Sequence, residues 1–373
     1  MKILVKNGIV IVDEHTTIAN GSVLVEDGII SAVGDVCEDA DQIIDAKGQY
    51  IVPALMDIHT HGAMGYDFNV CDKEDIDIIA ESYRKEGVTT FLGTLVCDSH
   101  EDLKKIFKNL QDCTTHAMEG VYIEGPFLSL AKKAVMKEEC LCDVNLDKFK
   151  EYKEICPKLI GMTVAPELEN AMELYALGKE MGVVMNVGHS DGTSQDVLAA
   201  EKAGAQSVTH LYNAMTQHEH RNPGVVTGAI LSNLYCEVIA DGFHVHEDVV
   251  KATYKAIGKD RIIIVSDANP CKGLPDGEYE FSGKDVVITN GEARVKQTGR
   301  IAGGTLKMDQ GCRNMMKWCN ASISDCLQMC VMNPARLYKM NKGFLKVGFD
   351  GDILVMDKDF HPIHLISEDT VWY

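Results

Sequence analysis

Short apolar runs recur along most of this 373-residue chain, and each run is followed by a helical or loop segment. Eight of these runs are predicted to be strands, because they are short and apolar and are bounded by polar or turn-forming residues. They end near residues 56, 95, 123, 164, 187, 209, 240 and 265. Eight strand–helix units over this length predict an α/β fold, the (β/α)8 TIM barrel.

The two ends of the chain show a different pattern. Residues 1–51 contain short β-rich segments without a helical period, and Asp27-Gly28 between two of them is a hairpin turn signal. The last segment, 343–373, returns to strand and turn after a helical stretch. We expect the two ends to pair, so that residues 1–51 and 343–373 form a small β-sandwich domain and residues 52–342 form the barrel.

Six residues that can bind a metal or carry a proton stand at the ends of predicted strands. His59 and His61 follow the first run, and side chains two apart in a strand point to the same side. The ends of other strands supply Glu124, His189, His210 and Asp267. In a TIM barrel these ends meet on the face that holds active sites. The pattern therefore predicts a catalytic metal site with histidine and carboxylate ligands.

The residue types suggest what this site does. Imidazole and carboxylate without thiolate favour Zn²⁺, with Fe²⁺ or Mn²⁺ as other possibilities. A divalent ion lowers the pKa of bound water toward ~7 and polarises a carbonyl group. Asp267 could take the proton from that water, or it could be a further ligand, and the two roles do not exclude each other.

Composition limits the partners of the chain. The formal net charge of -20 argues against nucleic acid, and no apolar stretch approaches the ~20 residues of a membrane span. Thirteen cysteines without a framework spacing suit a reducing compartment, and the apolar run at the N-terminus is too short for a signal peptide. We therefore expect a cytoplasmic protein with a small-molecule substrate.

Several motifs resemble those of one enzyme family. They are Asp57-Ile58-His59-Thr60-His61-Gly62, Glu124-Gly125-Pro126-Phe127, Gly188-His189-Ser190, Thr209-His210-Leu211-Tyr212-Asn213-Ala214-Met215, His220-Arg221-Asn222-Pro223-Gly224, Asp241-Gly242-Phe243-His244 and Ser266-Asp267-Ala268. The chain resembles, over nearly its whole length, the N-acetylglucosamine-6-phosphate deacetylases of the amidohydrolase superfamily. The resemblance implies metal-dependent hydrolysis of the acetamide of an N-acetyl amino-sugar 6-phosphate, foremost N-acetylglucosamine 6-phosphate, to glucosamine 6-phosphate and acetate.

The resemblance also implies roles for individual residues. It implies a metal at Glu124, His189 and His210, and Asp267 as the acid/base. Because His59 and His61 are present, the chain resembles the branch with two metals rather than one. Sugar-phosphate contacts are implied for Asn213, Ala214, Arg221, His244 and the backbone of Ile301, Ala302 and Gly303. The family's arginine reaches into the neighbouring subunit, which implies a homodimer.

The chain departs from the family at one loop. Where the family usually has Gly-Ala-His, with a histidine that contacts substrate, this chain has Ala134, Val135 and Met136. A thioether cannot donate a hydrogen bond. Either the loop has moved, or the substrate differs, or catalysis is weaker. The alternatives are thus another amide hydrolase of the superfamily with a changed substrate, or a non-catalytic sugar-phosphate binder.

Overall fold

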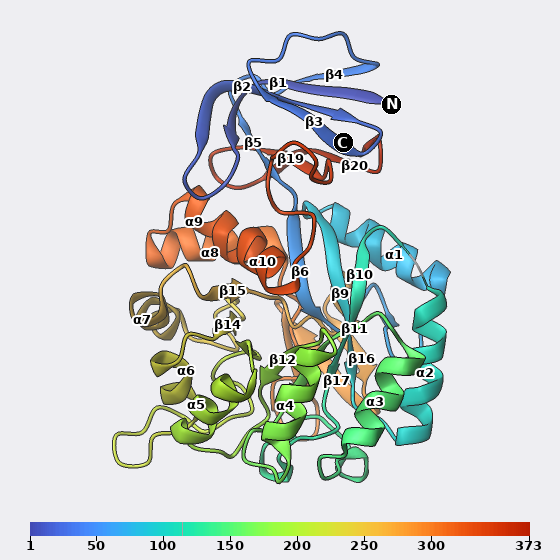
Figure 1. Ribbon diagram of the computed structural model, residues 1–373, viewed down its shortest axis with the longest axis vertical. Coiled ribbons are helices and arrows are strands. Elements are labelled where there is room, and N and C mark those ends of the chain that lie inside the picture. The colour runs from blue at the N-terminus through green and yellow to red at the C-terminus, as the bar shows by residue number, and fades with distance from the viewer. Residues whose placement is uncertain (114) are drawn as a thin grey trace.

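The computed structural model describes residues 1–113 and 115–373, and it confirms the predicted fold (Figure 1). Eight parallel strands form the sheet of a nearly closed barrel, each hydrogen-bonded to the next in chain order. They are β6 (Leu55–Thr60), β9 (Val88–Val96), β10 (Met118–Glu124), β11 (Leu159–Val164), β12 (Val184–Val187), β13 (Ser207–Val208), β14 (Tyr235–Val238) and β15 (Ile262–Ile264). A parallel bridge between Thr60 and Ala268 joins the segment after β15 to β6.

Helices surround this sheet, with α1 to α3 on the right in Figure 1, α4 at the lower centre and α5 to α8 on the left. They are α1 (Lys73–Arg84), α2 (His100–Asp112), α3 (Leu146–Ile155), α4 (Ala171–Glu180), α5 (Ser194–Ala203), α6 (Val225–Leu231), α7 (Glu247–Ile257), α8 (Met308–Cys319), α9 (Ile323–Leu327), a π-helical turn (Gln328–Met332) and α10 (Asn333–Tyr338). Local signals set their starts. Helix α1 begins at a capping box formed by Asp72 and Asp75, and its buried side is apolar.

The second large sheet contains strands from both ends of the chain, as predicted (Figure 1, top). Its members are β1 (Lys2–Ile11), β2 (Thr17–Glu26), β3 (Ile29–Gly34), β4 (Gln42–Asp45), β5 (Tyr50–Pro53), β19 (Ile353–Met356), β20 (Pro362–Ser367) and β21 (Thr370–Val371). It encloses a separate apolar cluster that includes Ile3, Val23 and Ile353. The division into domains at residues 52 and 342 stays a prediction.

One predicted strand is two strands. The apolar run 51–56 was expected to form a single barrel strand, but Tyr50–Pro53 (β5) pairs with β19 and only Leu55–Thr60 (β6) pairs with β9. The chain changes sheets at Ala54, whose N–H donates to Asp352 of the tail. Pro53 has no N–H for a sheet ladder, so the run is weakest as a strand at this point. Apolar character predicts a buried strand but not which sheet it joins.

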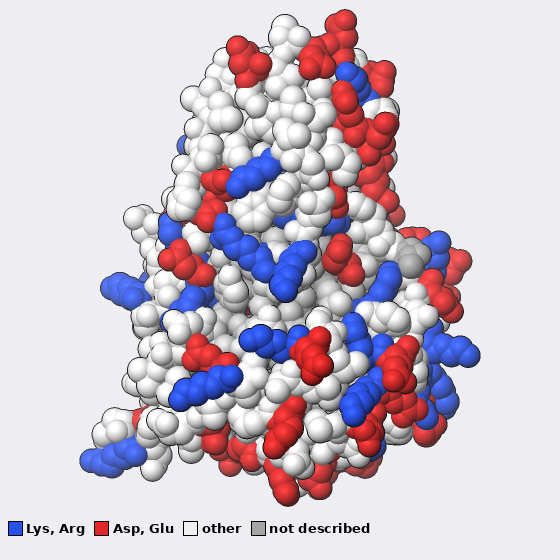
Figure 2. All heavy atoms as spheres, viewed as in Figure 1, with Lys and Arg blue, Asp and Glu red and all other residues white. Residues whose placement is uncertain are grey.

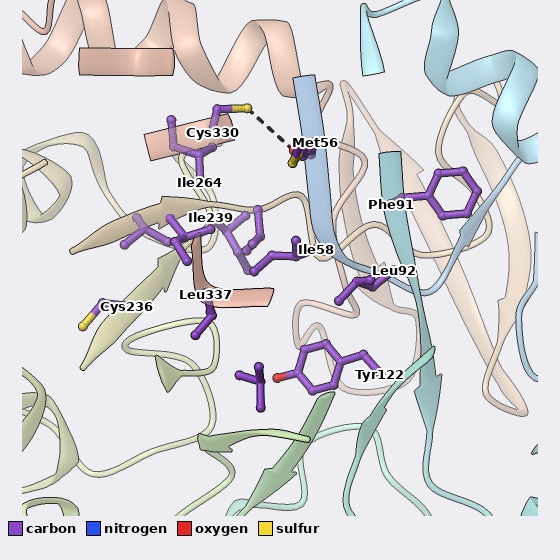
Figure 3. Close-up of a cluster of buried hydrophobic side chains, with 14 of the residues drawn as sticks. Met56, Ile58, Phe91, Leu92, Tyr122, Cys236, Ile239, Ile264, Cys330 and Leu337 are labelled. Atoms are coloured by element: carbon purple, nitrogen blue, oxygen red, sulfur yellow. Dashed lines mark hydrogen bonds between the residues drawn. The ribbon is translucent and has the colours of Figure 1, made fainter. Parts of the chain in front are cut away.

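One face of β6 points to the apolar core, and the other points to the candidate site. Met56 and Ile58 lie in an apolar cluster with Cys330 and Leu337 of the C-terminal helices (Figure 3). The Cys330 thiol donates to the Met56 carbonyl. Side chains alternate along a strand, so His59 points to the opposite face. The buried apolar face thereby fixes the direction of the histidines.

A three-stranded antiparallel sheet borders the end of the barrel that carries the predicted site. It contains β16 (Gly277–Phe281), β17 (Lys284–Thr289) and β18 (Glu292–Val295), and the short pair β7 (Gly62–Ala63) and β8 (Tyr66–Asp67) follows β6. Two 3-10 turns, Leu130–Lys132 and Glu138–Cys140, flank the loop at Met136. Met136 and Phe281 belong to one apolar cluster, so this sheet supports that loop.

The surface carries side chains of both charges. Acidic side chains gather along the upper right edge of the face in Figure 2, and acidic and basic side chains are mixed over its lower part. The thirteen cysteines are free thiols. Among the described residues, no helix combines the length and the apolar character needed to cross a membrane.

Candidate active site

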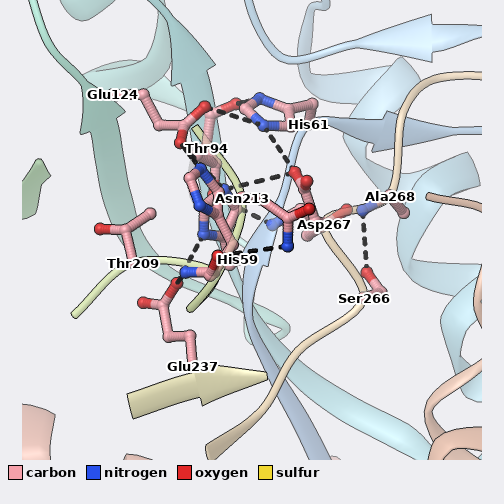
Figure 4. A network of polar contacts seen from close by, with 12 residues as sticks. His59, His61, Thr94, Glu124, Thr209, Asn213, Glu237, Ser266, Asp267 and Ala268 are labelled. Atoms are coloured by element: carbon pink, nitrogen blue, oxygen red, sulfur yellow. Dashed lines mark hydrogen bonds and ion pairs between the residues drawn. The ribbon is translucent and has the colours of Figure 1, made fainter. Parts of the chain in front are cut away.

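The structure brings the six predicted side chains together in the barrel. Figure 4 shows four of them, His59, His61, Glu124 and Asp267. Nε2 of His210 lies 2.9 Å from Oε1 of Glu124, and Nε2 of His189 lies 3.2 Å from the same oxygen. His61 Nε2 is 3.4 Å from the other oxygen of Glu124 and 3.2 Å from Asp267 Oδ1. All these side chains are buried or nearly so. The glutamate thus stands between two pairs of histidines.

Hydrogen bonds at Nδ1 set the direction of three of the imidazole rings. His61 Nδ1 lies 3.1 Å from the Thr94 carbonyl, and His189 Nδ1 lies 2.9 Å from the Lys132 carbonyl. A carbonyl oxygen only accepts, so each Nδ1 must carry the hydrogen. His59 Nδ1 contacts the Glu237 carboxylate at 2.8 Å. In all three rings Nε2 is therefore left to face Glu124 or Asp267.

This arrangement fits a divalent cation. Two sets of three donor atoms stand close enough to hold an ion, His59–His61–Glu124 and Glu124–His189–His210, and Glu124 belongs to both. Nε2 of His189 and Nε2 of His210 are only 3.1 Å apart and face one carboxylate oxygen. Lone pairs directed at one another repel unless a proton or a metal ion lies between them. Neutral imidazole and carboxylate are the donors that Zn²⁺ and related ions take.

The charges in the cluster reinforce each other. Burial opposes a charged ring, but Glu237, with Glu124 and Asp267, raises the pKa of His59 to about 9. Asp267 and Glu124 raise the pKa of His61 to about 10. Burial also opposes a charged carboxylate, but the histidines hold the pKa of Asp267 at about 2 and that of Glu124 well below its usual range. The carboxylates therefore favour positive charge in this cluster, carried by protons on the rings or, in their place, by a bound cation.

Asp267 is held in place by its neighbours. Its φ of +47° is left-handed, which non-glycine residues seldom adopt. The Ser266 N–H donates to Asp57 Oδ1 at 3.2 Å, the Ser266 hydroxyl bonds the same carboxylate, and the Ala268 N–H donates to Ser266 Oγ at 3.1 Å. The Asp267 N–H itself donates to the His59 carbonyl at 2.9 Å. Each residue of the turn is thus fixed, and the carboxylate faces the histidines.

A cavity opens onto this cluster and contains most of the predicted substrate contacts. Its lining includes Val135, Met136, Asn213, Ala214, His244, Ile301 and Gly303, besides His61, Glu124, His189, His210 and Asp267. The loop at Met136 has therefore not moved away from the site. His244 is oriented by Asp241, whose Oδ2 lies 2.6 Å from its Nδ1.

Two predicted contacts lie outside the cavity lining within one chain. Ala302 is buried beside it, and its carbonyl accepts a hydrogen bond from Asn269. Arg221 stands in an exposed loop, where its guanidinium bonds the neighbouring His220. Among the described residues that line the cavity, none is lysine or arginine. A single chain thus offers a phosphate no permanently charged cation here.

Sequence reasoning missed several residues that shape the site. Val96 and Phe281 line the cavity, and Glu237 contacts His59. Phe281 comes from the small antiparallel sheet, whose position no local pattern predicts. Glu237 did leave a signal, because it is a charged residue inside the apolar run 235–240. A charge in a buried strand needs a partner, and His59 is that partner.

Comparison with known proteins agrees with this geometry. The sequence profile described as "Amidohydrolase family" matches residues 50–371. The N-acetylglucosamine-6-phosphate deacetylase of Bacillus subtilis is 32% identical over 99% of this chain and 96% of its own length. The chain belongs to the amidohydrolase family. Within it, the N-acetylgalactosamine-6-phosphate deacetylase of Escherichia coli is 30% identical over 90% of each chain.

Solved amidohydrolase structures extend the likeness to the fold. A mutant N-acetyl-D-glucosamine-6-phosphate deacetylase from Mycobacterium smegmatis, solved in complex with N-acetyl-D-glucosamine-6-phosphate, superposes with a TM-score of 0.92 at 26% identity. The match covers 100% of this chain and 98% of that one. The deacetylase of Thermotoga maritima gives a TM-score of 0.86 at 27% identity, covering 99% of both chains. These matches confirm the resemblance drawn from the motifs.

Proposed function

We propose that this chain hydrolyses the acetamide of an N-acetyl amino-sugar 6-phosphate, foremost N-acetylglucosamine 6-phosphate, to acetate and the free amine. The observation that carries the proposal is the convergence of four histidines on Glu124, with Asp267 facing them across the same cavity. The N-acetylglucosamine-6-phosphate and N-acetylgalactosamine-6-phosphate deacetylases match 90% or more of the chain, which supports the same substrate class.

Two ligand sets would each hold a metal ion. Glu124, His189 and His210 form one ligand set, and His59 and His61 with Glu124 form the second. We assign Zn²⁺ as the ion, one or two per chain, with Fe²⁺ or Mn²⁺ able to occupy the same donors. When bound, the ion activates a water molecule and polarises the carbonyl of the acetamide.

The protein's own residues handle the proton. The Asp267 carboxylate faces the cavity beside His61 and can accept a proton from the attacking water. The oxygen of that water bonds to the acetyl carbon, the carbon–nitrogen bond breaks, and Asp267 returns the proton to the leaving nitrogen. The fixed turn around Asp267 keeps its carboxylate at this position throughout, so little reorganisation is needed during the reaction.

The sugar phosphate would occupy the rest of the cavity. We assign its phosphate to His244, which Asp241 orients, and to Arg221 of a second copy, because no lysine or arginine of the described lining supplies a charge. Asn213, Ala214 and the backbone at Ile301–Gly303 would contact the sugar. This assignment requires a homodimer, and we infer a cytoplasmic location from the composition.

The loop at Met136 makes one wall of the substrate pocket apolar. Val135 and Met136 line it together with Val96 and Phe281, so the wall is apolar on this side. Such a wall offers no hydrogen bond to the sugar, which favours a weaker or differently selective deacetylase. This departure is also the observation that favours the second candidate, an amide hydrolase of the family with another substrate.

Product analysis tests the proposal. Purified protein, supplied with Zn²⁺, is incubated in parallel with N-acetylglucosamine 6-phosphate, N-acetylgalactosamine 6-phosphate and unphosphorylated N-acetylglucosamine. We expect equal amounts of acetate and amine, with the phosphorylated sugars turned over faster. If no N-acetyl sugar phosphate is cleaved while another amide is, the second candidate is correct. Binding without turnover of any amide would indicate a sugar-phosphate binder.

A further inference from the structure

Glu237 lies behind the proposed metal site, on the side of His59 that faces away from Glu124 (Figure 4). It belongs to β14, and neither its side chain nor that of His59 is exposed to solvent. We propose that Glu237 is a positioning residue that builds the second metal site: its carboxylate orients His59 and increases the basicity of the ring nitrogen that binds the ion. This inference rests on the metal site proposed above.

The geometry gives His59 one orientation. Nδ1 of His59 lies 2.8 Å from Glu237 Oε2, while Nε2 has no hydrogen-bond partner among the described residues. That free nitrogen lies 3.7 Å from Glu124 Oε1 and 3.5 Å from Asp267 Oδ1. The carboxylate accepts the Nδ1 hydrogen, so the lone pair of Nε2 is directed at the site. A rotated ring would lose its only hydrogen bond to a buried charge.

The acceptor at His59 differs from the acceptors at the other rings. His61 and His189 donate to neutral backbone carbonyls, of Thr94 and Lys132. Among the described residues, His59 is the one ring of these four histidines whose Nδ1 meets a carboxylate, since Nδ1 of His210 has no partner there. A charged acceptor makes the opposite nitrogen a stronger donor toward a metal. His59 belongs to the His59–His61–Glu124 set alone. Through the ring of His59, the charge of Glu237 therefore acts on that set.

Glu237 also fixes where the two ligand sets stand relative to each other. The same Oε2 accepts the backbone N–H of His210 at 3.2 Å. His210 belongs to the Glu124–His189–His210 set. One carboxylate oxygen thus touches a ligand residue of each set, at the ring in one and at the backbone in the other.

A role in folding alone explains the burial of Glu237 less well than a role in binding a cation. The second oxygen of Glu237, Oε1, has no hydrogen-bond partner among the described residues, so the carboxylate is only partly satisfied. A buried charge of this kind destabilises a fold unless an opposite charge compensates it. A positive charge at Nε2 of His59, carried by a proton or in its place by a metal ion, would compensate it through the ring.

Ion binding tests the role without relying on catalysis. Glu237→Gln keeps an oxygen that can accept both hydrogen bonds but removes the charge. Wild type and variant are stripped of metal and titrated with Zn²⁺ against a competing chelator. We expect wild type to bind two ions, and the variant to bind the second one about 10–100-fold more weakly with the first unchanged. His59→Ala should lose the same ion, and adding Glu237→Gln to it should change nothing further.

Matched controls separate this role from a folding defect. Glu167 accepts hydrogen bonds from Ser190 and Asp191 beside the site, and within the described part of the chain it bonds no histidine ring. Glu167→Gln should therefore bind both ions normally. Should Glu237→Gln not fold, ¹⁵N histidine spectra of zinc-loaded wild type decide instead, with His59 expected to carry hydrogen on Nδ1 and to coordinate through Nε2.

Three results would overturn the inference. They are wild type that binds a single ion, Glu237→Gln that binds both ions with unchanged affinity, and His59 coordination through Nδ1. The proposed function fails in a different way. A chain that binds two ions but releases no acetate would refute the deacetylase activity and leave the role of Glu237 intact.

Discussion

Replacing Asp267 with asparagine isolates the proton transfer. The two side chains have nearly the same size, and the hydrogen bonds that hold the turn involve Asp57, Ser266 and Ala268 rather than the Asp267 carboxylate. The fold and the position of the side chain should therefore survive. An amide, however, cannot take a proton from water or return it to the leaving nitrogen. Asp267→Asn should thus retain metal and lose turnover.

The structure allows the size of this loss to be stated. Asp267 Oδ1 lies 3.2 Å from His61 Nε2, so a water molecule held among the histidines would be within its reach. We assign the proton transfer to Asp267 alone. A positioned acid/base contributes ~10²–10⁴ in rate, which corresponds to about 3–5 kcal/mol of activation free energy. We expect kcat to fall by that factor, with a much smaller change in KM.

The assay measures acetate release at saturating N-acetylglucosamine 6-phosphate, with the metal content of each sample determined by elemental analysis. Asp191→Asn serves as the control, because Asp191 is an exposed carboxylate on the nearby loop whose described ion pair is with Lys132. That variant should keep kcat within about twofold of wild type. An Asp267→Asn protein that carries normal metal and a kcat within tenfold of wild type would refute the acid/base role.

Three further predictions concern the phosphate, the loop and stability. Arg221→Ala and His244→Ala should each raise KM for the phosphorylated sugar by about 10–100-fold, because a charge-assisted hydrogen bond is lost, and leave KM for the unphosphorylated sugar unchanged. Equal changes in both KM values would contradict the assignment. Met136→His should raise kcat/KM on N-acetylglucosamine 6-phosphate by roughly tenfold, whereas an unchanged value would show that the loop does not read the sugar. Burial opposes the charge on Asp352, but its hydrogen bond to His116 and the charge of Lys342 hold its pKa at about 2, below the unfolded value of 3.8. That interaction stabilises the folded chain by about 2 kcal/mol above pH 4 and is lost as pH falls toward 2, so the stability difference between wild type and Asp352→Asn should shrink over that interval in denaturant titrations.

The sequence predicts this fold well because its signals are local. Strand and helix periods identify the eight barrel strands, and the alternation of side chains places His59 and His61 on one face. The ends of parallel strands meet at one edge, so Glu124 and Asp267 could be placed there without knowing any contact. The strands, the helices and the face to which each side chain points are predictable because they follow from the backbone period of each element.

The remainder depends on contacts between distant segments. Nothing local shows that Tyr50–Pro53 joins the second sheet, since its partner strand lies some 300 residues away in the tail. Glu237 could be recognised as a buried charge but not as the partner of His59, because that pairing spans the barrel. Phe281 lines the cavity because the antiparallel sheet of β16, β17 and β18 packs there, and only tertiary packing sets the position of that sheet.

Metal-dependent acetate release tests the central claim most directly. The protein is stripped of metal with a chelator and reconstituted with increasing Zn²⁺, and acetate and glucosamine 6-phosphate are quantified after incubation with N-acetylglucosamine 6-phosphate. The structure predicts no release without metal, and equal amounts of both products in proportion to the ion bound at Glu124, His189 and His210. Acetate release that is undiminished in metal-free protein, or none at all in fully loaded protein, would contradict the account.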